Sequence, residues 1–367
     1  MVPQVRAPIL GANLGRREAV CALASRALSS RVWLVLNHAL YEPFHGRSLG
    51  CASALRALGG DMLRTTFIKL SESKSIRHFA ENSALGLRLS GRFVAGMHLA
   101  DAVRATEQVN HWGASVSIDN LGENVTNTDE AKHSAELYHQ MLDQISSRKL
   151  NANISLKLTH MGFDVDEDLA FRQVTELVAH AVQINSFVRV DMEGSPYTQR
   201  TLDFVRQLHR LPGHAGKVGT VIQTYLFRSE DDVKQLLSEG IRIRLCKGAY
   251  KEPPELAFPK KADVDANYLK LAKMLLKSGV YHGLATHDEN IIEQVKRFAK
   301  AENIPSTAYE FQMLHGVRRD LQQKLVRDGY GMRVYIPFGT EWYPYFMRRL
   351  AERPANVLFI ARNLLRQ

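Results

Sequence analysis

Cysteine is scarce in this chain, and its three occurrences lie too far apart to form a site. Cys21, Cys51 and Cys246 are an odd number without a CxxC pair, which excludes a disulfide framework and a cysteine-based zinc or redox motif. This usage is typical of a protein that works in a reducing compartment.

Long apolar runs are lacking too. The stretch VWLVL at 32–36 is far shorter than the roughly 18 apolar residues that a membrane-spanning helix needs. The sequence therefore predicts a soluble chain, or one that touches a membrane only at its surface.

Acidic residues are few near the amino terminus. The net charge is +10, and residues 1–61 contribute seven arginines and no lysine against Glu18, Glu42 and Asp61. The remaining residues show neither a basic helix with interleaved aromatic side chains nor zinc-ligand spacing, so we expect no nucleic acid as a partner. A mild attraction to anionic membrane surfaces stays open.

Residues 1–61 also lack a sustained apolar period and are rich in Ala, Ser, Leu and Arg. This composition resembles a transit peptide, and it equally fits a start codon assigned too far upstream, with Met62 as the real start. We favour the second interpretation and treat residues 62–367 as one domain. The expected location is the cytoplasm, with peripheral contact at the inner membrane left open; a mitochondrial location follows only if 1–61 is a genuine transit peptide.

From about residue 85, short β-rich runs alternate with charged helical stretches, the clearest of which are 128–147, 263–279 and 318–329. Eight strands, each followed by a helix, are the number in an α/β fold of the (βα)8 TIM barrel type. The predicted strands are 114–123, 151–159, 187–193, 218–226, 241–250, 281–288, 307–316 and 332–339.

Alternation within the predicted strands supports a closed barrel. Val188 and Val190 point one way, and Arg189 and Asp191 the other. An apolar face suits an outer ring of helices, so the polar face is expected to point into the barrel. A doubly wound open sheet is the alternative, but the glycine-rich GxGxxG turn that often follows its first strand is missing.

Polar residues gather at the ends of the predicted strands, where a barrel carries its chemistry. Each of them could belong to a buried layer of ion pairs. Together they are costly to bury without a ligand, because every strand contributes. The set is Asp119, Glu123, Lys157, Asp191, Glu193, Gln223, Arg244, Lys247, Thr286, His287, Glu310, Gln312 and Tyr335.

This set contains no nucleophile with an adjacent base and no histidine pair spaced for a metal, since His287 stands alone. Its donors suit an anionic cofactor with a pyrophosphate and a polar ring edge. Lys247 and Gly248 in RLCKGAY (244–250) are the best candidates for phosphate contact, because glycine permits close approach of the backbone.

A helical stripe near the carboxyl terminus adds two adjacent cations. In YFMRRLAER (345–353), Tyr345, Arg348, Arg349 and Glu352 stand at i, i+3, i+4 and i+7. A solvated surface pair between Arg349 and Glu352 is one interpretation. We favour a receptor for a small carboxylate, because two guanidinium groups repel unless an anion lies between them.

The ordered motifs from about Met62 to the carboxyl terminus resemble the proline dehydrogenase family. They are RFVAG (92–96), IDNLGE (118–123), ISLKLT (154–159), VDMEG (190–194), VIQTYL (221–226), IRLCKGAY (243–250), ATHD (285–288), YEFQMLHG (309–316), RVYIPFG (333–339) and YFMRRLAER (345–353). The resemblance implies a distorted (βα)8 barrel that holds FAD non-covalently. It also implies oxidation of L-proline to Δ1-pyrroline-5-carboxylate, with electrons passed to a membrane quinone.

The same resemblance implies roles for single residues. Those at the substrate are Arg348, Arg349 and Lys157 on the carboxylate, Tyr335, Tyr345 and Leu314 around the ring, Asp191 as organiser, and Glu123 as the partner of Arg348 in a gate. Those at the cofactor are Arg244 beside flavin N5, Gln223 on the ring edge, and Met192, Cys246, Lys247, Gly248, Thr286, His287 and Glu352 along the rest. Two alternatives remain, which are oxidation of 4-hydroxyproline by the same scaffold and a barrel that binds flavin without catalysis.

Overall fold

The structure is a computed structural model, and it describes residues 90–122, 125–250 and 252–352. Two compact units divide the chain. Unit 2 spans Gly91–Trp342, and Ser90 and residues 343–352 are the described part of unit 1. Glu123 and the predicted boundary at Met62 lie outside the described residues, as do the side chains of Arg348 and Glu352.

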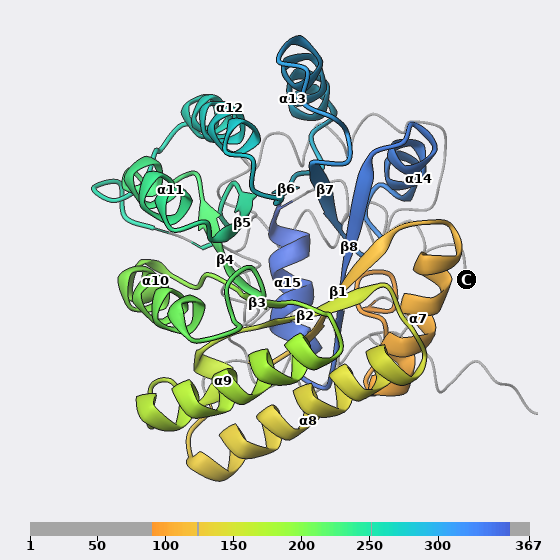
Figure 1. Cartoon of the computed structure of the whole chain (residues 1–367), viewed down its shortest axis with the longest axis vertical. Helices are drawn as coiled ribbons and strands as arrows, with labels where there is room; N and C mark the ends of the chain where they lie inside the picture. Colours follow the sequence, from red (N-terminus) through yellow and green to blue (C-terminus); the bar gives the residue numbers. More distant parts are fainter. Residues whose placement is uncertain (1–89, 123–124, 251, 353–367) are drawn as a thin grey trace, which may run out of the picture. The chain divides into compact units, whose positions relative to one another are not determined.

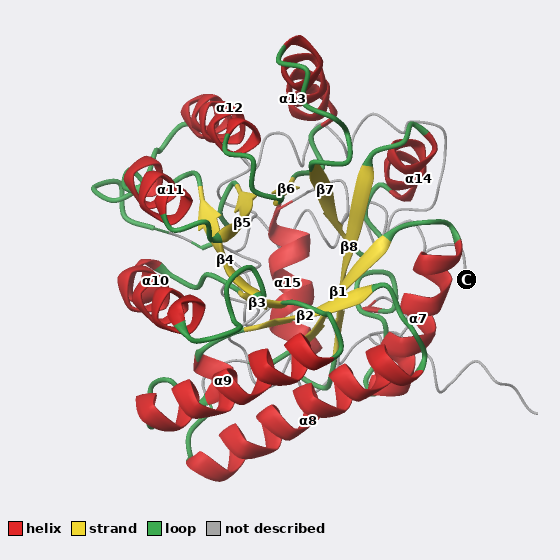
Figure 2. Cartoon of the chain, in the orientation of Figure 1, coloured by secondary structure: helices red, strands yellow, loops and turns green. Residues whose placement is uncertain are grey.

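Unit 2 is a closed barrel of eight parallel strands, as predicted (Figures 1 and 2). Each strand pairs with the next, and β8 closes the ring by pairing with β1 over six residues, from Ser115 opposite Arg333 to Asn120 opposite Phe338. Closure excludes the doubly wound open sheet. The strands are β1 (Ser115–Asn120), β2 (Ala152–Leu156), β3 (Val188–Val190), β4 (Val218–Gln223), β5 (Arg242–Cys246), β6 (His282–Ala285), β7 (Tyr309–Leu314) and β8 (Gly331–Phe338).

Helices follow the strands and surround the barrel of unit 2 (Figure 2). In the described part of unit 2 they are α7 (Leu99–His111), α8 (Thr128–Ser147), the 3-10 turn η1 (Thr159–Met161), α9 (Glu167–Gln183), α10 (Ser195–Arg210), α11 (Ser229–Ser238), α12 (Lys261–Lys277), α13 (Glu289–Ala301) and α14 (Arg319–Arg327). Helix α15 (Trp342–Glu352) belongs to the other unit from Tyr343 on. The helices predicted at 128–147, 263–279 and 318–329 correspond to α8, α12 and α14.

Helix α8 shows why the prediction succeeded. The Asn127 side chain caps its first turn by accepting hydrogen bonds from the backbone N–H groups of Asp129 and Glu130. Its buried face includes Tyr138 and Met141, one turn apart, and packs on β2 and on α9. Capping and periodicity therefore point to the same element.

Helix α7 was not predicted, and it makes the barrel irregular. It precedes β1 in the chain and packs against both β1 and β8. It thus covers the seam between the first and last strands, where the last helix lies in a regular (βα)8 barrel. Ala102 and Val109 are among the side chains that it buries there.

The predicted strands run too far at their carboxyl ends. The strand predicted at 151–159 ends at Leu156, and Thr159 begins the 3-10 turn η1. The strand predicted at 187–193 ends at Val190. Polar and apolar residues still alternate in the sequence past the last ladder hydrogen bond, although residues 157–159 and 191–193 are all buried, so pattern alone misplaces the boundary.

The predicted alternation is confirmed. Val188, Val190, Ile154 and Leu156 have no exposed surface and belong to the core between strands and helices. The polar residues between them hydrogen-bond across the barrel interior, as described below. No helix in residues 90–122, 125–250 and 252–352 is long and apolar enough to span a membrane.

Candidate active site

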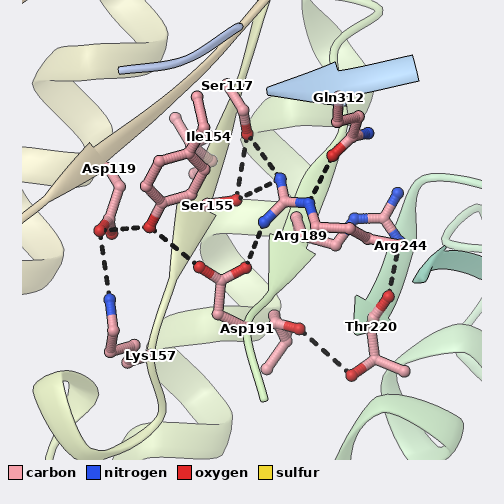
Figure 3. A network of polar contacts seen from close by, with 12 residues as sticks. Ser117, Asp119, Ile154, Ser155, Lys157, Arg189, Asp191, Thr220, Arg244 and Gln312 are labelled. Atoms are coloured by element: carbon pink, nitrogen blue, oxygen red, sulfur yellow. Dashed lines mark hydrogen bonds and ion pairs between the residues drawn. The ribbon is translucent and has the colours of Figure 1, made fainter. Parts of the chain in front are cut away.

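Arg244 on β5 is the centre of a buried polar network that includes side chains of β1, β2 and β7 and that of Asp191, the residue after β3 (Figure 3). Its Nη1 donates to Asp191 Oδ1 at 2.6 Å, and its Nε donates to Gln312 Oε1 at 2.6 Å. Its Nη2 donates to the hydroxyl oxygens of Ser117 at 3.1 Å and Ser155 at 3.0 Å. Because every guanidinium nitrogen has a partner from a different direction, the position and orientation of Arg244 are tightly fixed.

Tyr335 on β8 bridges two carboxyl groups. Its hydroxyl lies 2.5 Å from Asp119 Oδ2 and 3.0 Å from Asp191 Oδ2. A phenol has one proton and donates to one carboxylate at a time, so the second contact requires a proton on a carboxyl group. Burial, and then the two neighbouring carboxylates, raise the pKa of Tyr335 well above its ordinary value, which keeps the phenol protonated.

Asp119 is the carboxyl group that can carry the second proton. Only 1% of its surface is exposed. Burial raises its pKa, against the opposing effect of the Lys157 ammonium, and the charge of Asp191 raises it further. Lys157 Nζ lies 3.1 Å from Asp119 Oδ2, and Tyr138 donates to Asp119 Oδ1 at 3.1 Å. A proton held at Asp119 thus allows both contacts of the Tyr335 hydroxyl to be hydrogen bonds, and its loss would leave one of them without a donor.

The loops after β2 and β3 hold each other through Glu193. Its carboxylate accepts hydrogen bonds from the Thr159 backbone N–H at 3.2 Å and the Thr159 hydroxyl at 2.7 Å. Gln223 at the end of β4 donates from Nε2 to the Glu193 carbonyl at 2.9 Å, and its Oε1 accepts from the Ala249 N–H at 3.4 Å. Gln223 thus ties the loop after β3 to the KGAY segment.

The KGAY segment has a structural reason for its glycine. Gly248 has a φ of +120°, and a Cβ there would lie 2.3 Å from the Tyr225 ring. The neighbouring Lys247 ammonium lies 2.6 Å from Asp265 and 3.2 Å from Asp288. Burial, the largest single effect, raises the pKa of these two carboxyl groups, but the hydrogen bonds and charges of Lys247 and Lys261 together lower it below the ordinary value.

The other predicted cofactor residues of unit 2 lie at the carboxyl ends of neighbouring strands. Thr286 follows β6, and its hydroxyl accepts the N–H of Asp288 at 3.1 Å. His287 Nε2 accepts the N–H of Leu314 at 3.0 Å, which places the proton of the neutral ring on Nδ1. Met192, two residues after the end of β3, is buried, and Cys246 at the end of β5 is half-buried.

Helix α15 carries the predicted carboxylate receptor. Its bounds, Trp342–Glu352, put Tyr345 and Arg349 one turn apart, as the sequence pattern predicted. The Arg349 guanidinium lies over the Tyr345 ring, 5.1 Å from the ring centre, a cation–π contact that orients it. Residues 343–352 belong to the other unit, and convergence of Arg349 and Lys157 on one carboxylate stays a prediction.

Ser117 and Ser155 are members of the network that the sequence analysis missed. They stand two residues before Asp119 and Lys157, and they hydrogen-bond each other at 3.0 Å. The two-residue period of a strand could have identified them, since residues i and i+2 share a face. They were not selected as candidates because serine is small and uncharged.

The donor set fits an anionic cofactor better than a metal. Lys157, Lys247 and the amide of Gln223 follow or end parallel strands, at the edge where α/β folds bind ligands, and Arg244 stands in the middle of β5. In the residues that the structure describes, no group of three His, Cys, Asp or Glu side chains could hold a metal ion.

Comparison with known proteins gives a consistent result. A model of the family "Proline dehydrogenase" matches residues 102–362. Proline dehydrogenase 1 of Bacillus subtilis (strain 168) is 40% identical over 307 residues, which are 83% of this chain and 100% of the relative. Proline dehydrogenase of Deinococcus radiodurans is 37% identical over 310 residues, 83% of this chain and 98% of the relative.

A solved structure shares the fold. Proline utilization A (PutA) from Bdellovibrio bacteriovorus, inactivated by N-propargylglycine, superposes with a TM-score of 0.71 at 23% identity. The match covers 88% of this chain and 40% of that longer one. Together with the whole-length relatives, these matches show that the chain is a member of the proline dehydrogenase family.

Proposed function

We propose that this protein oxidises L-proline to Δ1-pyrroline-5-carboxylate with FAD as its cofactor and a membrane quinone as electron acceptor. The observation that carries the proposal is the network centred on Arg244, which holds Asp191, Tyr335, Asp119 and Lys157 together at the end of the barrel that catalyses reactions in this fold. Membership of the family supports the choice of substrate.

Cations hold the substrate in this account. Lys157, Arg348 and Arg349 bind the carboxylate of proline and so fix the orientation of its ring. Lys157 is already charged and paired with Asp119 at 3.1 Å. A substrate carboxylate therefore competes with Asp119 for the same ammonium group, and the raised pKa of Asp119 lets that side chain become neutral when the substrate takes its place.

The remaining residues hold the flavin. Arg244 and Gln223 would contact its ring system, and Lys247, Gly248, Thr286 and His287 the ribityl and phosphate portion. The flavin, when bound, accepts a hydride from the proline carbon next to the ring nitrogen. Arg244 supplies positive charge fixed by four side chains, and such preorganised charge stabilises negative charge that develops nearby.

Replacement of Arg349 by lysine tests the carboxylate receptor. The ammonium of lysine cannot reproduce the two parallel donors of a guanidinium, so the KM for L-proline is expected to rise about tenfold or more while the flavin content stays unchanged. Arg172→Lys, an exposed position on α9, is the matched control. An unchanged KM in Arg349→Lys would refute the assignment.

The choice between proline and 4-hydroxyproline depends on Tyr335. The two hydrogen bonds of its hydroxyl, at 2.5 and 3.0 Å, fix the phenol in the barrel interior. A phenol fixed next to the substrate ring leaves little room for an added hydroxyl group. Comparison of kcat/KM for the two substrates is expected to favour L-proline, and a preference for 4-hydroxyproline would overturn the choice.

A further inference from the structure

A cavity opens at the opposite end of the barrel from the candidate active site. Its volume is about 240 Å³, below the roughly 300 to 1,000 Å³ of pockets for drug-sized ligands. Residues that begin strands line it, including Asn153, Phe187, Lys217, Arg242 and Arg333. Arg244 and Gln312 also line it, so the cavity reaches the underside of the Arg244 network.

Cations dominate the lining. Glu310 is the carboxylate among the lining residues, and it is already bound by Arg333 Nε at 2.6 Å, by Gln312 and by Tyr281. Arg244 is paired with Asp191. Three further cations, those of Arg189, Arg242 and Lys217, make no ion pair with any carboxylate of the described residues.

Arg189 is the most exceptional of the three. Only 3% of its surface is exposed, and its two hydrogen bonds to protein both come from Nη1, to the carbonyl oxygens of Thr220 at 2.8 Å and Arg242 at 2.7 Å. Its Nε and Nη2 have no protein partner within the described residues. Burial and then the charges of Arg244 and Arg242 lower its pKa well below the ordinary value.

Arg242 is close to Arg189. Both guanidinium groups face the Phe187 ring, at 4.7 Å for Arg189 and 4.2 Å for Arg242. Arg242 Nε donates to the Tyr281 carbonyl at 3.2 Å, which leaves both terminal nitrogens available. Lys217 at the rim donates to Asn185 Oδ1 at 2.7 Å. Like charges this close are unfavourable unless an anion balances them.

We propose that the cavity at the amino-terminal end of the barrel binds a small oxyanion with two negative charges, held by Arg189, Arg242 and Lys217. The unused guanidinium donors supply hydrogen bonds, and the enclosed volume excludes larger ligands. Phosphate and short dicarboxylates share this chemistry. Occupancy places negative charge beneath Arg244 and thereby links this second site to the active-site network.

Calorimetric titration of the full-length flavin-loaded protein tests the proposal. Inorganic phosphate and, separately, malonate are titrated at constant ionic strength, with chloride as the background anion. Saturable binding of at least one of the two anions is expected, with one site per chain. Chloride, a spherical ion with a single charge, should not compete for the site, and constant ionic strength keeps electrostatic screening equal in all titrations. Absence of saturable binding for both would overturn the proposal.

Variants locate the bound ion. Arg242→Gln is expected to weaken binding at least tenfold and Lys217→Ala severalfold, whereas Arg172→Gln, which removes one exposed charge on α9, leaves it unchanged. The Lys217 side chain hydrogen-bonds only Asn185 in the described part of the chain, and alanine keeps the backbone hydrogen bonds of this position, so Lys217→Ala is expected to fold even if Arg242→Gln does not. An unchanged affinity of Lys217→Ala for the anion would contradict the assigned site. So would a loss of affinity in Arg172→Gln as large as that in Lys217→Ala.

Discussion

At the scale of single residues, the active-site network consists of groups that hold one another in place. Arg244 binds four side chains, and Tyr335 binds two carboxyl groups. Asp191 hydrogen-bonds both Arg244 and Tyr335, so the positions of these two side chains depend on each other. Such buried polar networks are favourable only when each member is satisfied.

Tyr335→Phe is expected to lower kcat/KM for L-proline about tenfold without loss of flavin. The substitution removes hydrogen bonds to two carboxyl groups, and a hydrogen bond to a charged group contributes roughly 1.5 to 3 kcal/mol. Tyr309→Phe is the matched control, because the Tyr309 hydroxyl is buried without a hydrogen-bond partner in the described residues. Equal activity of the two variants would mean that Tyr335 only fills space.

His282 on β6 makes the stability of the fold depend on pH. Burial, reinforced by the charges of Arg189 and Arg242, lowers its pKa from 6.5 to about 3. The folded state therefore keeps this histidine neutral while the unfolded chain binds a proton below pH 6.5. The contribution of His282 to the free energy of unfolding is therefore fully present above pH 6.5. It falls by about 1.4 kcal/mol for each pH unit as the pH decreases from 6.5 toward 3.

Removal of the titrating group is expected to flatten this dependence. Between pH 8 and pH 5 the free energy of unfolding of the unmodified protein should fall by about 2 kcal/mol more than that of His282→Gln, measured by urea denaturation. His133→Gln, an exposed position on α8, serves as control and should follow the unmodified protein. Parallel curves for His282→Gln and the unmodified protein would show that His282 does not titrate as its burial requires.

At the scale of elements, the strands and helices could largely be predicted because two-residue and 3.6-residue periods reflect burial directly. The long helix at 128–147 was predicted to its observed bounds, since Asn127 marks its start. Helix α7 was missed although its apolar stripe is no weaker than those of α8 and α12. It precedes β1, and a pattern of strands that are each followed by a helix leaves no place for it. Strand ends were misplaced because Lys157 and Asp191 keep the alternation after the ladder has ended.

Gly248→Ala is expected to lower the free energy of unfolding by at least about 2 kcal/mol and to reduce flavin content. Two effects add, because a side chain is strained at a φ of +120° and its Cβ would meet the Tyr225 ring at 2.3 Å. Gly279→Ala isolates the first effect, since Gly279 has a φ of +73° and open space around it. It should cost about 1 kcal/mol and leave flavin content unchanged.

Similar losses of stability and flavin in both glycine variants would contradict this account. In that case the close approach of Tyr225 to the KGAY segment would contribute nothing beyond backbone conformation. Replacement of Tyr225 by leucine in the Gly248→Ala background provides a further check, since it should recover part of the stability by relieving the contact.

At the scale of the whole molecule, the barrel and its polar interior could be predicted, but the completeness of the active site could not. The sequence places Arg348 and Arg349 on a helix after β8, and α15 is that helix. The strand ends that this helix faces are determined by packing between the two units. Local sequence periodicity carries no information about that packing. The predicted gate of Glu123 with Arg348 falls outside the described side chains.

A chain that begins at Met62 is expected to fold, bind flavin and oxidise L-proline. The proposal rests on the irregular, acid-poor composition of residues 1–61, which lack the apolar period of a packed element. Size-exclusion chromatography and flavin content of the shortened chain provide the measurement. Aggregation or loss of flavin relative to the full chain would show that residues 1–61 contribute to the domain.

The most direct test of the central claim is the flavin absorbance of the purified protein under anaerobic conditions. The account predicts a flavin spectrum that bleaches when L-proline is added and that recovers on addition of a quinone. 4-Hydroxyproline should bleach it far more slowly, because the phenol of Tyr335 is fixed by hydrogen bonds in the barrel interior. A colourless protein that takes up no FAD, or a flavin spectrum unchanged by L-proline, would contradict the account.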